Sequence, residues 1–477
     1  MHSQFEIVMG LETHVRVASR TKLFCSCENQ LELADEPNIR VCPVCMGMPG
    51  ALPVLSKWVV DLSLKASHAL LMEIHQVSRF DRKSYSYPDL PSGYQITQLY
   101  EPIATNGEVR TMIDGEIKTF RVNRLHIEAD AGKLVHTGWL TLCDYNRSGA
   151  PLVEIVTEPD FRSKAEVIAY LEELQKLMRW CGASDADMDK GQLRCDVNIS
   201  IRPHGDTNLY SRVELKNINS FSAIGRAIDV EFARQIKITA NGGTIDQETR
   251  GWDDEKWVSH SMRSKENAMD YRYFPEPDLL PLVLTNEEID GTKIMWLPID
   301  RRLKYLEYGL LTDDARILSD RKELSDFYDA LVSMTNDPKK SASLITTVLF
   351  ALMSEHHDSG DFSNLKFQPK DLARLYNLLR DDAISSTNSK KVVEVLYLEG
   401  GDVDDIIAKH NLGQTNDNDA LRAIVQSVLT SHPTQVSELK AGNVKLLGFL
   451  VGQCMKASSW SGNPKLFNEI LQKELSL

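Results

Sequence analysis

The 477-residue chain is predicted to fold as an α+β protein, with a strand-rich N-terminal part followed by an all-helical part. Residues 1 to about 293 are rich in Gly, Pro and Tyr and alternate between apolar and polar residues over short runs, a pattern typical of strands and turns. After Leu297 and Pro298, Lys, Glu, Leu and Ala recur at helical spacing and Gly becomes rare. These observations place a domain boundary near residue 295, and the Gly-Gly break within residues 399–402 marks a second one.

One clear helix interrupts the strand-rich part, over residues 163–181. Ser163 stands at the N-cap position and Glu166 follows three residues later, an arrangement that satisfies backbone N–H groups at a helix start. Apolar residues recur on one helix face, at Val167, Ile168, Leu171, Leu174, Leu177 and Met178. Gly182 follows as a C-terminal stop, and residues 55–71 form a second predicted helix.

Charge and composition exclude several protein classes. Lys and Arg number 54 and Asp and Glu 68, and the net charge of −14 argues against a protein whose whole surface binds nucleic acid, although it permits a local basic patch. With 42% hydrophobic and 26% charged residues, the chain is not disordered, collagenous or a coiled coil. The longest nearly apolar stretch, residues 344–353, is about half the ~20 residues of a membrane span. No signal-like segment opens the chain, so we expect a soluble protein of the bacterial cytoplasm or an organelle matrix, with no membrane partner.

Four separated strands each place polar residues on one face, because side chains alternate and residues i and i+2 point the same way. The shared faces hold Glu12, His14 and Arg16; His126, Glu128 and Asp130; Asp196, Asn198 and Ser200; and Glu214 with Lys216. Carboxylates that converge from several strands suit Mg²⁺ and substrate phosphates, as metal-assisted phosphoryl transfer requires. Solvated outer faces of ordinary antiparallel sheets alternate in the same way. Both interpretations stay open, because the sequence does not show that the four faces meet.

Two further segments, residues 80–89 and 270–278, combine cations with aromatic rings. Such a combination suits a nucleotide, with charge for the phosphates and a ring face for the base. The candidate nucleotide-binding residues are Lys83, Tyr85, Tyr271 and Arg272. A sheet edge protected by charged residues is the alternative. The sequence contains no Walker A motif and no glycine-rich dinucleotide motif at a helix start, so neither a P-loop enzyme nor a Rossmann enzyme is supported.

Four of the eight cysteines stand at metal-ligand spacing. A C-x-C pair is followed after fourteen residues by a C-x-x-C pair, and the residues are Cys25, Cys27, Cys42 and Cys45. Two close pairs separated by a short loop match the knuckle of a closed structural Zn²⁺ site, for which we expect a role in stability and not in catalysis. Chance clustering of inert thiols is the alternative. The other cysteines are isolated, and so sparse a use of cysteine suits a reducing compartment.

A series of short motifs runs in order along nearly the whole chain. The first are Val8-Met-Gly-Leu-Glu-Thr-His14, Phe80-Asp-Arg-Lys83, Tyr94-Gln-Ile-Thr-Gln98, Glu128-Ala-Asp-Ala-Gly-Lys133, Asp144-Tyr-Asn-Arg147 and Pro151-Leu-Val-Glu-Ile-Val156. The later ones are Leu193-Arg-Cys-Asp196, Glu214-Leu-Lys-Asn-Ile-Asn219, Gln247-Glu-Thr-Arg250, Asp270-Tyr-Arg-Tyr-Phe-Pro-Glu-Pro-Asp278 and Leu447-Gly-Phe-Leu-Val-Gly-Gln-Cys-Met-Lys456. This series closely resembles the family of B subunits of the tRNA-dependent amidotransferase that converts Glu-tRNA(Gln) or Asp-tRNA(Asn) to the amide form.

The resemblance implies a heterotrimer of A, B and C subunits. The A subunit would release ammonia from glutamine, and a channel would carry it to the B subunit, where ATP phosphorylates the misacylated carboxylate before ammonia attacks. The implied activity is that of a carbon–nitrogen ligase with glutamine as amido donor. The implied fold is a catalytic cradle domain on antiparallel sheet over residues 1–294, a helical domain over 295–404 and a small tail over 405–477, like that of the YqeY proteins, which would contact tRNA.

The resemblance also assigns site residues by their place in the motifs. Glu12, His14, Glu128 and Asp130 match the family's Mg²⁺ region, Lys83 and Tyr85 match its phosphate-proximal loop, and Asp196, Glu214 and Lys216 match the remaining polar strands. The catalytic set implied is Glu12, His14, Lys83, Glu128, Asp196, Glu214 and Lys216, with ATP and Mg²⁺ as cofactors, beside the structural Zn²⁺ expected from the cysteine spacing. His14 is implied either as a ligand in the Mg²⁺ region or as a proton acceptor from ammonia.

One motif departs from the family pattern, which usually reads Glu-Glu-Asp-Ala-Gly-Lys where this chain has Ala129 after Glu128. If the missing acid is a metal ligand in relatives, Glu128, Asp130 or a water must replace it here. A non-catalytic tRNA-binding scaffold with a decayed ATP site is therefore the alternative function. The archaeal glutamate-specific relative carries an inserted synthetase-like domain, for which 477 residues leave no room.

The C-terminal tail is more basic than the rest of the chain. Between Leu421 and Leu477 there are six cations against three acids, a net charge of +3. Such a balance fits contact with a tRNA backbone. An ordinary solvated helical face would give the same count, so charge alone does not decide between them.

Overall fold

The computed structural model of the protein describes residues 4–30, 36–264, 270–357, 360–458 and 461–475. The chain divides into two compact units, Met1–Asp300 and Arg301–Leu477. The first is built on β-sheet with a few helices, and the second carries helices and no strand among its described residues. The predicted α+β class is confirmed, whereas the division into three functional domains stays a prediction.

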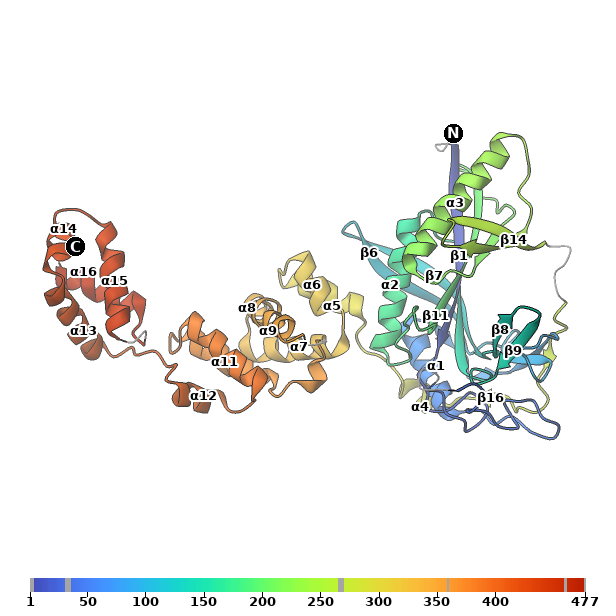
Figure 1. Cartoon of the computed structure of the whole chain (residues 1–477), viewed down its shortest axis with the longest axis horizontal. Helices are drawn as coiled ribbons and strands as arrows, with labels where there is room; N and C mark the ends of the chain where they lie inside the picture. The colour runs from blue at the N-terminus through green and yellow to red at the C-terminus, as the bar shows by residue number, and fades with distance from the viewer. Residues whose placement is uncertain (1–3, 31–35, 265–269, 358–359, 459–460, 476–477) are drawn as a thin grey trace. The chain divides into compact units, whose positions relative to one another are not determined.

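A nine-stranded sheet frames the first unit, with the strand order β14-β13-β12-β11-β1-β10-β7-β6-β2 (Figure 1). Every neighbouring pair is antiparallel except β12 and β13. The strands are β1 Phe5–Arg16, β2 Glu73–Ile74, β6 Ala104–Ile113, β7 Glu116–Ala129, β10 Pro151–Thr157, β11 Leu193–Pro203, β12 Val213–Lys216, β13 Glu248–Asp253 and β14 Val258–Ser264. The first strand in sequence therefore lies at the centre of the sheet.

The two faces of this sheet differ in chemistry. In β1, Leu11, Thr13 and Val15 are buried, whereas Glu12 and His14 between them are half-buried. The apolar face belongs to a core shared with the helices α1 Lys57–Ala69, α2 Lys164–Trp180 and α3 Phe221–Ala240. The alternate side chains point to the opposite face, away from those helices.

Both helices predicted in this part are confirmed, and α2 shows why its sequence encodes a helix. Ser163 Oγ accepts a hydrogen bond of 3.2 Å from the Glu166 N–H, which satisfies one of the free donors of the first turn. The apolar face of α2 is buried in the core. Gly182 follows the last turn with φ +69°, a left-handed conformation that glycine adopts without a steric penalty.

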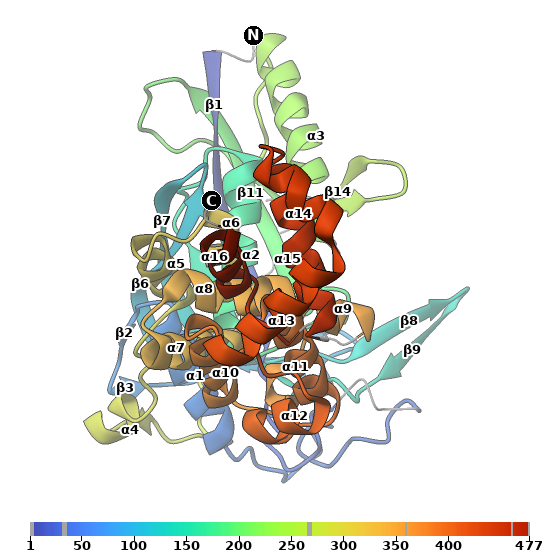
Figure 2. The same ribbon diagram turned by 90° about the vertical axis from the view of Figure 1, so that its left-hand side faces the viewer.

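Three small sheets complete the first unit. β4 Asp81–Ser84 lies between β5 Tyr94–Thr97 and β15 Phe274–Pro275. The pairing of β4 with β15 brings together the two segments that were predicted to bind a nucleotide. β3 Val77–Ser78 pairs with β16 Leu282–Val283, close in sequence to α4 Asn286–Asp290. β8 Lys133–Thr137 and β9 Leu140–Asp144 form a hairpin that extends away from the nine-stranded sheet (Figure 2).

The second unit contains two separate hydrophobic cores. One includes Tyr305, Leu331 and Leu396 and gathers α5 Pro298–Glu307, α6 Thr312–Leu318, α7 Lys322–Thr335, α8 Pro338–Ser343, a π-helical turn Leu344–Leu349, α9 Phe350–Glu355, a 3₁₀ turn Phe362–Asn364, α10 Pro369–Arg380, α11 Ser386–Leu398 and α12 Val403–His410. The other includes Leu421 and Phe467 and gathers α13 Asn418–Ser431, α14 Pro433–Lys440, α15 Lys445–Ala457 and α16 Pro464–Leu475. In the part of the chain that the structure describes, no helix is long and apolar enough to cross a membrane.

Candidate active site

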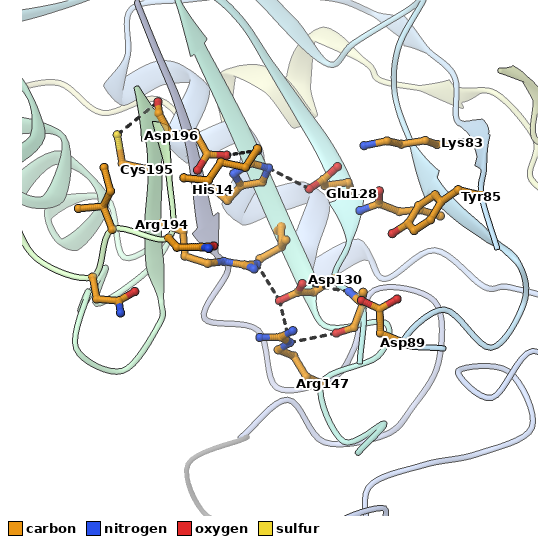
Figure 3. A pocket seen from close by; sticks show the side chains of 17 residues that line it. His14, Lys83, Tyr85, Asp89, Glu128, Asp130, Arg147, Arg194, Cys195 and Asp196 are labelled. Atoms are coloured by element: carbon orange, nitrogen blue, oxygen red, sulfur yellow. Dashed lines mark hydrogen bonds and ion pairs between the residues drawn. The ribbon is translucent and has the colours of Figure 1, made fainter. Parts of the chain in front are cut away.

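A pocket of about 390 Å³ opens over the polar face of the nine-stranded sheet (Figure 3). Its walls come from β1, β4, β5, β7, β10, β11 and β12 and from the loops that follow β4, β7, β9 and β12. Of the predicted catalytic residues, those that line it are His14, Lys83, Glu128, Asp196 and Lys216. Residues from five separate stretches of sequence therefore meet in one cavity.

Strand pairing explains why they meet. β1 lies between β10 and β11, so Glu12 stands opposite Asp196 on one side. On the other side His14 stands opposite Glu154, and Glu154 in turn stands opposite His126 of β7. The polar faces thus form one continuous surface, as the metal-site interpretation required.

His14 belongs to two clusters of candidate metal ligands. Its Nε2 lies 3.5 Å from Glu128 Oε1 and 3.4 Å from Glu154 Oε2. The second cluster consists of His14, Glu12 and Asp196, and in each cluster one ligand atom from every residue lies within 4.8 Å of the others. Carboxylates and imidazole at this spacing can enclose a divalent cation.

The crowded acids shift the pKa values of the cluster. Burial raises the pKa of Glu12, and the neighbouring Glu154 raises it further. Burial lowers the pKa of His14, but the hydrogen bond with Glu154 and the charge of Glu128 outweigh it and raise that pKa to about 9. Burial would raise the pKa of Glu154, yet His126 and His14 hold it well below its usual range. The face therefore carries negative charge that a cation would offset.

Glu154 is a candidate ligand to which the sequence analysis assigned no role. It is buried, and His126 Nε2 lies 3.2 Å from its Oε2. One feature of the sequence could have indicated a role for Glu154. It is the only charged residue of β10, which is otherwise almost wholly apolar. An acid in so apolar a strand must find a partner when it is buried.

Lys216 offsets the negative charge of two acids at the other end of the polar face. Its Nζ lies 2.5 Å from Asp196 Oδ2 and 3.0 Å from Glu214 Oε1, and the Thr249 hydroxyl donates to Glu214 Oε2 at 2.8 Å. Burial lowers the pKa of Lys216, but Asp196 and Glu214 outweigh it and raise that pKa. Glu214 supports Lys216 without lining the pocket itself.

Lys83 lies on β4 and faces the two clusters of candidate metal ligands. Burial lowers its pKa, but the charge of Glu128 contributes to a net rise. Its Nζ lies 4.8 Å from the centre of the Tyr271 ring, and Tyr85 meets Tyr271 edge to face at 5.9 Å between ring centres. Within the described residues no ion pair involves Lys83, so its ammonium group is available to a ligand. Arg272 is exposed and does not line this pocket.

Asp130 lines the pocket but lies outside both ligand clusters. Its Oδ2 accepts a hydrogen bond of 2.9 Å from Arg194 Nη2 and lies 3.5 Å from Arg147 Nε. Its Oδ1 accepts from the Ala131 N–H at 3.0 Å. The carboxylate predicted as a Mg²⁺ ligand is thus already held by two arginines and a backbone donor.

Ala129 points to the opposite side of β7. It packs against the apolar core and lines a separate pocket with Phe24 and Ile96. Because neighbours on a strand face opposite ways, an acid at this position would not reach the clusters around His14. The departure at Ala129 therefore removes no ligand from them.

The four predicted zinc cysteines meet in a cluster of their own. One sulfur from each lies within 4.8 Å of the others. The fully buried Lys22 places Nζ 3.6 Å from Cys45 Sγ and donates to the Arg40 carbonyl at 2.8 Å. A hydrogen bond from Cys25, together with Lys22, lowers the pKa of the Cys45 thiol to about 5. Four sulfurs with a buried cation beside them form a donor set that fits Zn²⁺.

Replacing Lys216 by Met should lower the free energy of unfolding by roughly 1–3 kcal/mol, because Asp196 and Glu214 lose their shared cation while the position stays partly open to solvent. Urea unfolding of the chain in metal-free buffer measures the change. The exposed pair Lys190–Asp187, at 3.3 Å, supplies the control Lys190→Met, which should change stability by less than about 0.5 kcal/mol. If the two variants lowered the free energy of unfolding equally, Lys216 would not be the cation that stabilises Asp196 and Glu214.

Comparison with protein families gives two matches. The model described as the GatB/GatE catalytic domain matches residues 7–290 of the 477, and the model described as the GatB domain matches residues 326–475. The first match covers all the residues that line the pocket.

Several curated proteins, each named as the B subunit of an aspartyl/glutamyl-tRNA(Asn/Gln) amidotransferase, are similar over nearly the full length. The protein from Persephonella marina is 45% identical over 99% of this chain and 100% of its own. That from Lachnospira eligens is 44% identical over 99% of both chains, and that from Carboxydothermus hydrogenoformans is 42% identical over 99% of both. On these matches, the chain belongs to the GatB family of amidotransferase B subunits.

Proposed function

We propose that this chain is the subunit of a glutamine-dependent, tRNA-dependent amidotransferase that phosphorylates the side-chain carboxylate of Glu-tRNA(Gln) or Asp-tRNA(Asn) and then amidates it. Family membership and the names of the relatives support the overall reaction. The observation that carries the phosphorylation step is that His14, Glu128 and Lys83 line one pocket, while Glu154 completes a ligand cluster with His14 and Glu128.

The chemistry explains the need for phosphorylation. A free carboxylate is a poor acceptor for ammonia, because its oxygen is a poor leaving group. When a carboxylate oxygen attacks the γ-phosphorus of ATP, ADP departs and the carboxylate becomes an acyl phosphate. The nitrogen of ammonia then attacks the acyl carbon, the carbon–oxygen bond breaks, and inorganic phosphate leaves. The nitrogen loses a proton to a base or to water.

The residues in and beside the pocket receive distinct roles in this proposal. His14, Glu128 and Glu154 would hold a divalent cation, Mg²⁺ or Mn²⁺, which supplies charge stabilisation for phosphates, and Glu12 with Asp196 offers a second position. Lys83 would neutralise charge on the transferred phosphoryl group. Lys216 with Glu214 keeps Asp196 oriented. We place Asp130 among the residues that orient Arg147 and Arg194, since both already contact it.

Tyr85 and Tyr271, which lie beside Lys83, are proposed as the aromatic side of the ATP site. Arg272, exposed and away from the pocket lining, is assigned no contact there. The scaffold alternative, with a decayed ATP site, loses its main support, because Ala129 lies on the other side of β7 from the ligand clusters.

The partners follow from the same chemistry. The sequence lacks the Ser-Ser-Lys signature of amidases, so an A subunit would supply ammonia within a complex that also holds a C subunit. Residues 1–294 would carry the chemistry and 295–404 a connecting helical domain. Residues 405–477 would contact the tRNA backbone, a role supported by the +3 charge from residue 421 onward.

The test of the function is ADP release from ATP by the complex reconstituted with its A and C subunits, with ammonia supplied directly. We expect ADP release only when Glu-tRNA(Gln) or Asp-tRNA(Asn) is present, together with formation of the amidated tRNA. Lys83→Met should lower kcat roughly 10²–10³-fold, the usual cost of losing one group that stabilises transition-state charge, with tRNA affinity retained. The exposed Lys256 gives the control Lys256→Met, which should leave the rate unchanged. Tight tRNA binding without stimulated ADP release would instead establish the scaffold function.

The metal ligands can be separated from their neighbours by substitution. Glu154→Gln should weaken Mn²⁺ binding by at least roughly 10–100-fold, a loss that even an outer-shell partner of a metal site can cause. Asp130→Asn should change it by no more than a few-fold, because Asp130 is held by Arg194 and Arg147. Calorimetric titration of Mn²⁺ into each variant, with the fold checked by circular dichroism, measures both effects. The reverse ranking would return Asp130 to the ligand set.

The cysteine cluster should bind about one Zn²⁺ per chain, and Zn²⁺ binding should raise the unfolding temperature. Elemental analysis of the purified protein and thermal unfolding with and without a chelator provide the measurement. Cys27→Ser should reduce the zinc content, whereas Cys143→Ser, outside the cluster, should leave it unchanged. A metal-free protein of equal stability would refute the site.

A further inference from the structure

One carboxylate of the pocket has no role in the reaction as described so far. Asp89 lines the pocket on the loop between β4 and β5, on the same segment as Lys83 and Tyr85 (Figure 3). Its Oδ1 is buried and, within the residues that the structure describes, accepts no hydrogen bond. A shielded acceptor without a donor costs stability, and rotation of the carboxyl group about its Cβ–Cγ bond would turn this oxygen toward a donor in the pocket.

The other carboxylates that line the pocket are already paired with cations. Glu128 lies 3.5 Å from His14, Asp130 lies 2.9 Å from Arg194, and Asp196 lies 2.5 Å from Lys216. Asp89 is the exception among the described residues of the pocket. Burial raises the pKa of the Asp89 carboxyl, and this outweighs the opposing effects of a hydrogen bond from its own backbone N–H and of the Arg147 charge.

Arg147, whose charge acts on Asp89, makes its hydrogen bonds to other groups. Arg147 Nε donates to the Ala131 carbonyl at 3.0 Å, and its Nη2 donates to the Gly132 carbonyl at 2.8 Å. Its guanidinium group also lies 3.5 Å from Asp130. Arg147 therefore lowers the electrostatic cost at Asp89 without donating a hydrogen bond to it in the described structure.

The backbone around Asp89 is held in place from the far side of the pocket. The Gly132 N–H donates to the Asp89 carbonyl at 2.8 Å, and the Tyr145 hydroxyl donates to the Pro88 carbonyl at 2.7 Å. A Cβ at residue 132 would lie 3.1 Å from the Asp89 carbonyl oxygen and 2.9 Å from Tyr145 Cδ1, so a glycine there permits this approach. The main chain that carries the carboxylate is thus positioned before any ligand arrives, which lowers the entropy cost of binding.

The chemistry of the carboxylate favours a cationic donor. In an aminoacyl-tRNA the α-carboxyl group is esterified, so the α-ammonium group is the positive charge at the reacting end of the molecule. We propose, on the basis of the function proposed above, that Asp89 accepts a hydrogen bond from the α-ammonium group of the misacylated amino acid. Anchored there, the amino acid would extend its side-chain carboxylate toward Lys83 and His14, which line the same pocket.

A ribose hydroxyl of the nucleotide is the competing partner. Hydroxyl groups also donate to carboxylates, and the ionised acceptor strengthens both kinds of hydrogen bond, but only the ammonium group adds attraction between opposite charges. The half-buried carboxylate of Asp89 therefore gains more from the ammonium group.

The experiment compares Glu-tRNA(Gln) with its N-acetylated form in the reconstituted complex, with ammonia supplied directly, for wild type and Asp89→Asn. In wild type, acetylation removes the positive charge and should lower kcat/KM for the charged tRNA by roughly 10–100-fold beyond any steric effect. In Asp89→Asn the unmodified substrate should already show a loss of this size, and acetylation should add little. Asp89→Glu keeps the charge and should retain part of the sensitivity to acetylation.

Three results would overturn the proposal. The first is an equal cost of acetylation in wild type and in Asp89→Asn, which would leave no coupling between the two groups. The second is a raised KM for ATP in Asp89→Asn with the acetylation effect unchanged, which would assign Asp89 to the nucleotide. The third is a wild type without any tRNA-dependent ADP release, and only this result counts against the proposed function itself. The exposed Asp290 lies outside the pocket lining and gives the matched control Asp290→Asn, which should behave as wild type.

Discussion

Buried negative charge on one face of the central sheet is the constraint on which the rest of the catalytic unit depends. Glu128 and Glu154 are both buried beside His14, and acids in such a place repel one another unless cations lie among them. β1 is the middle strand, so His14 has a paired strand on each side, β10 and β11, whose side chains can contact it. The crowded acids oppose folding, and the same crowding makes this face the place where a divalent cation is attracted most strongly. Binding of the cation and stability of the fold are therefore linked at this face.

Hydrogen bonds join the cysteine cluster to one wall of the pocket through the loop that follows β9. The Ser148 hydroxyl donates to the Cys45 carbonyl at 3.0 Å, and Lys22 Nζ donates to the Tyr145 carbonyl at 3.3 Å. Further along the same loop, the Gly149 N–H donates to the Asp130 carbonyl at 2.9 Å. A closed metal knuckle would thus stiffen one wall of the pocket, and a structural role far from the reacting atoms would still affect catalysis.

Features that depend on neighbouring residues could be predicted from the sequence. The helix over residues 163–181 was predictable because its cap and its apolar spacing are local. Partners that come from distant strands could not be predicted in this way. Glu154 lies within one of the motifs, but no role could be assigned to it from the sequence, because its partners His14 and His126 lie on other strands. Asp130 was assigned to the metal by its motif, whereas its contacts are with arginines.

The sequence by itself determined which residues share a strand face, because alternation is a property of the extended backbone. It also determined the α+β class and the two close pairs of cysteines. Only the tertiary structure decided which of those faces meet. β10 lies about 140 residues after β1, yet it pairs with β1 and brings Glu154 to His14. It also left Asp89 Oδ1 without a donor among the described residues, since that depends on where Arg147 and Gly132 direct their hydrogen bonds. Strand order and loop contacts are set by packing across the whole unit, which no local pattern encodes.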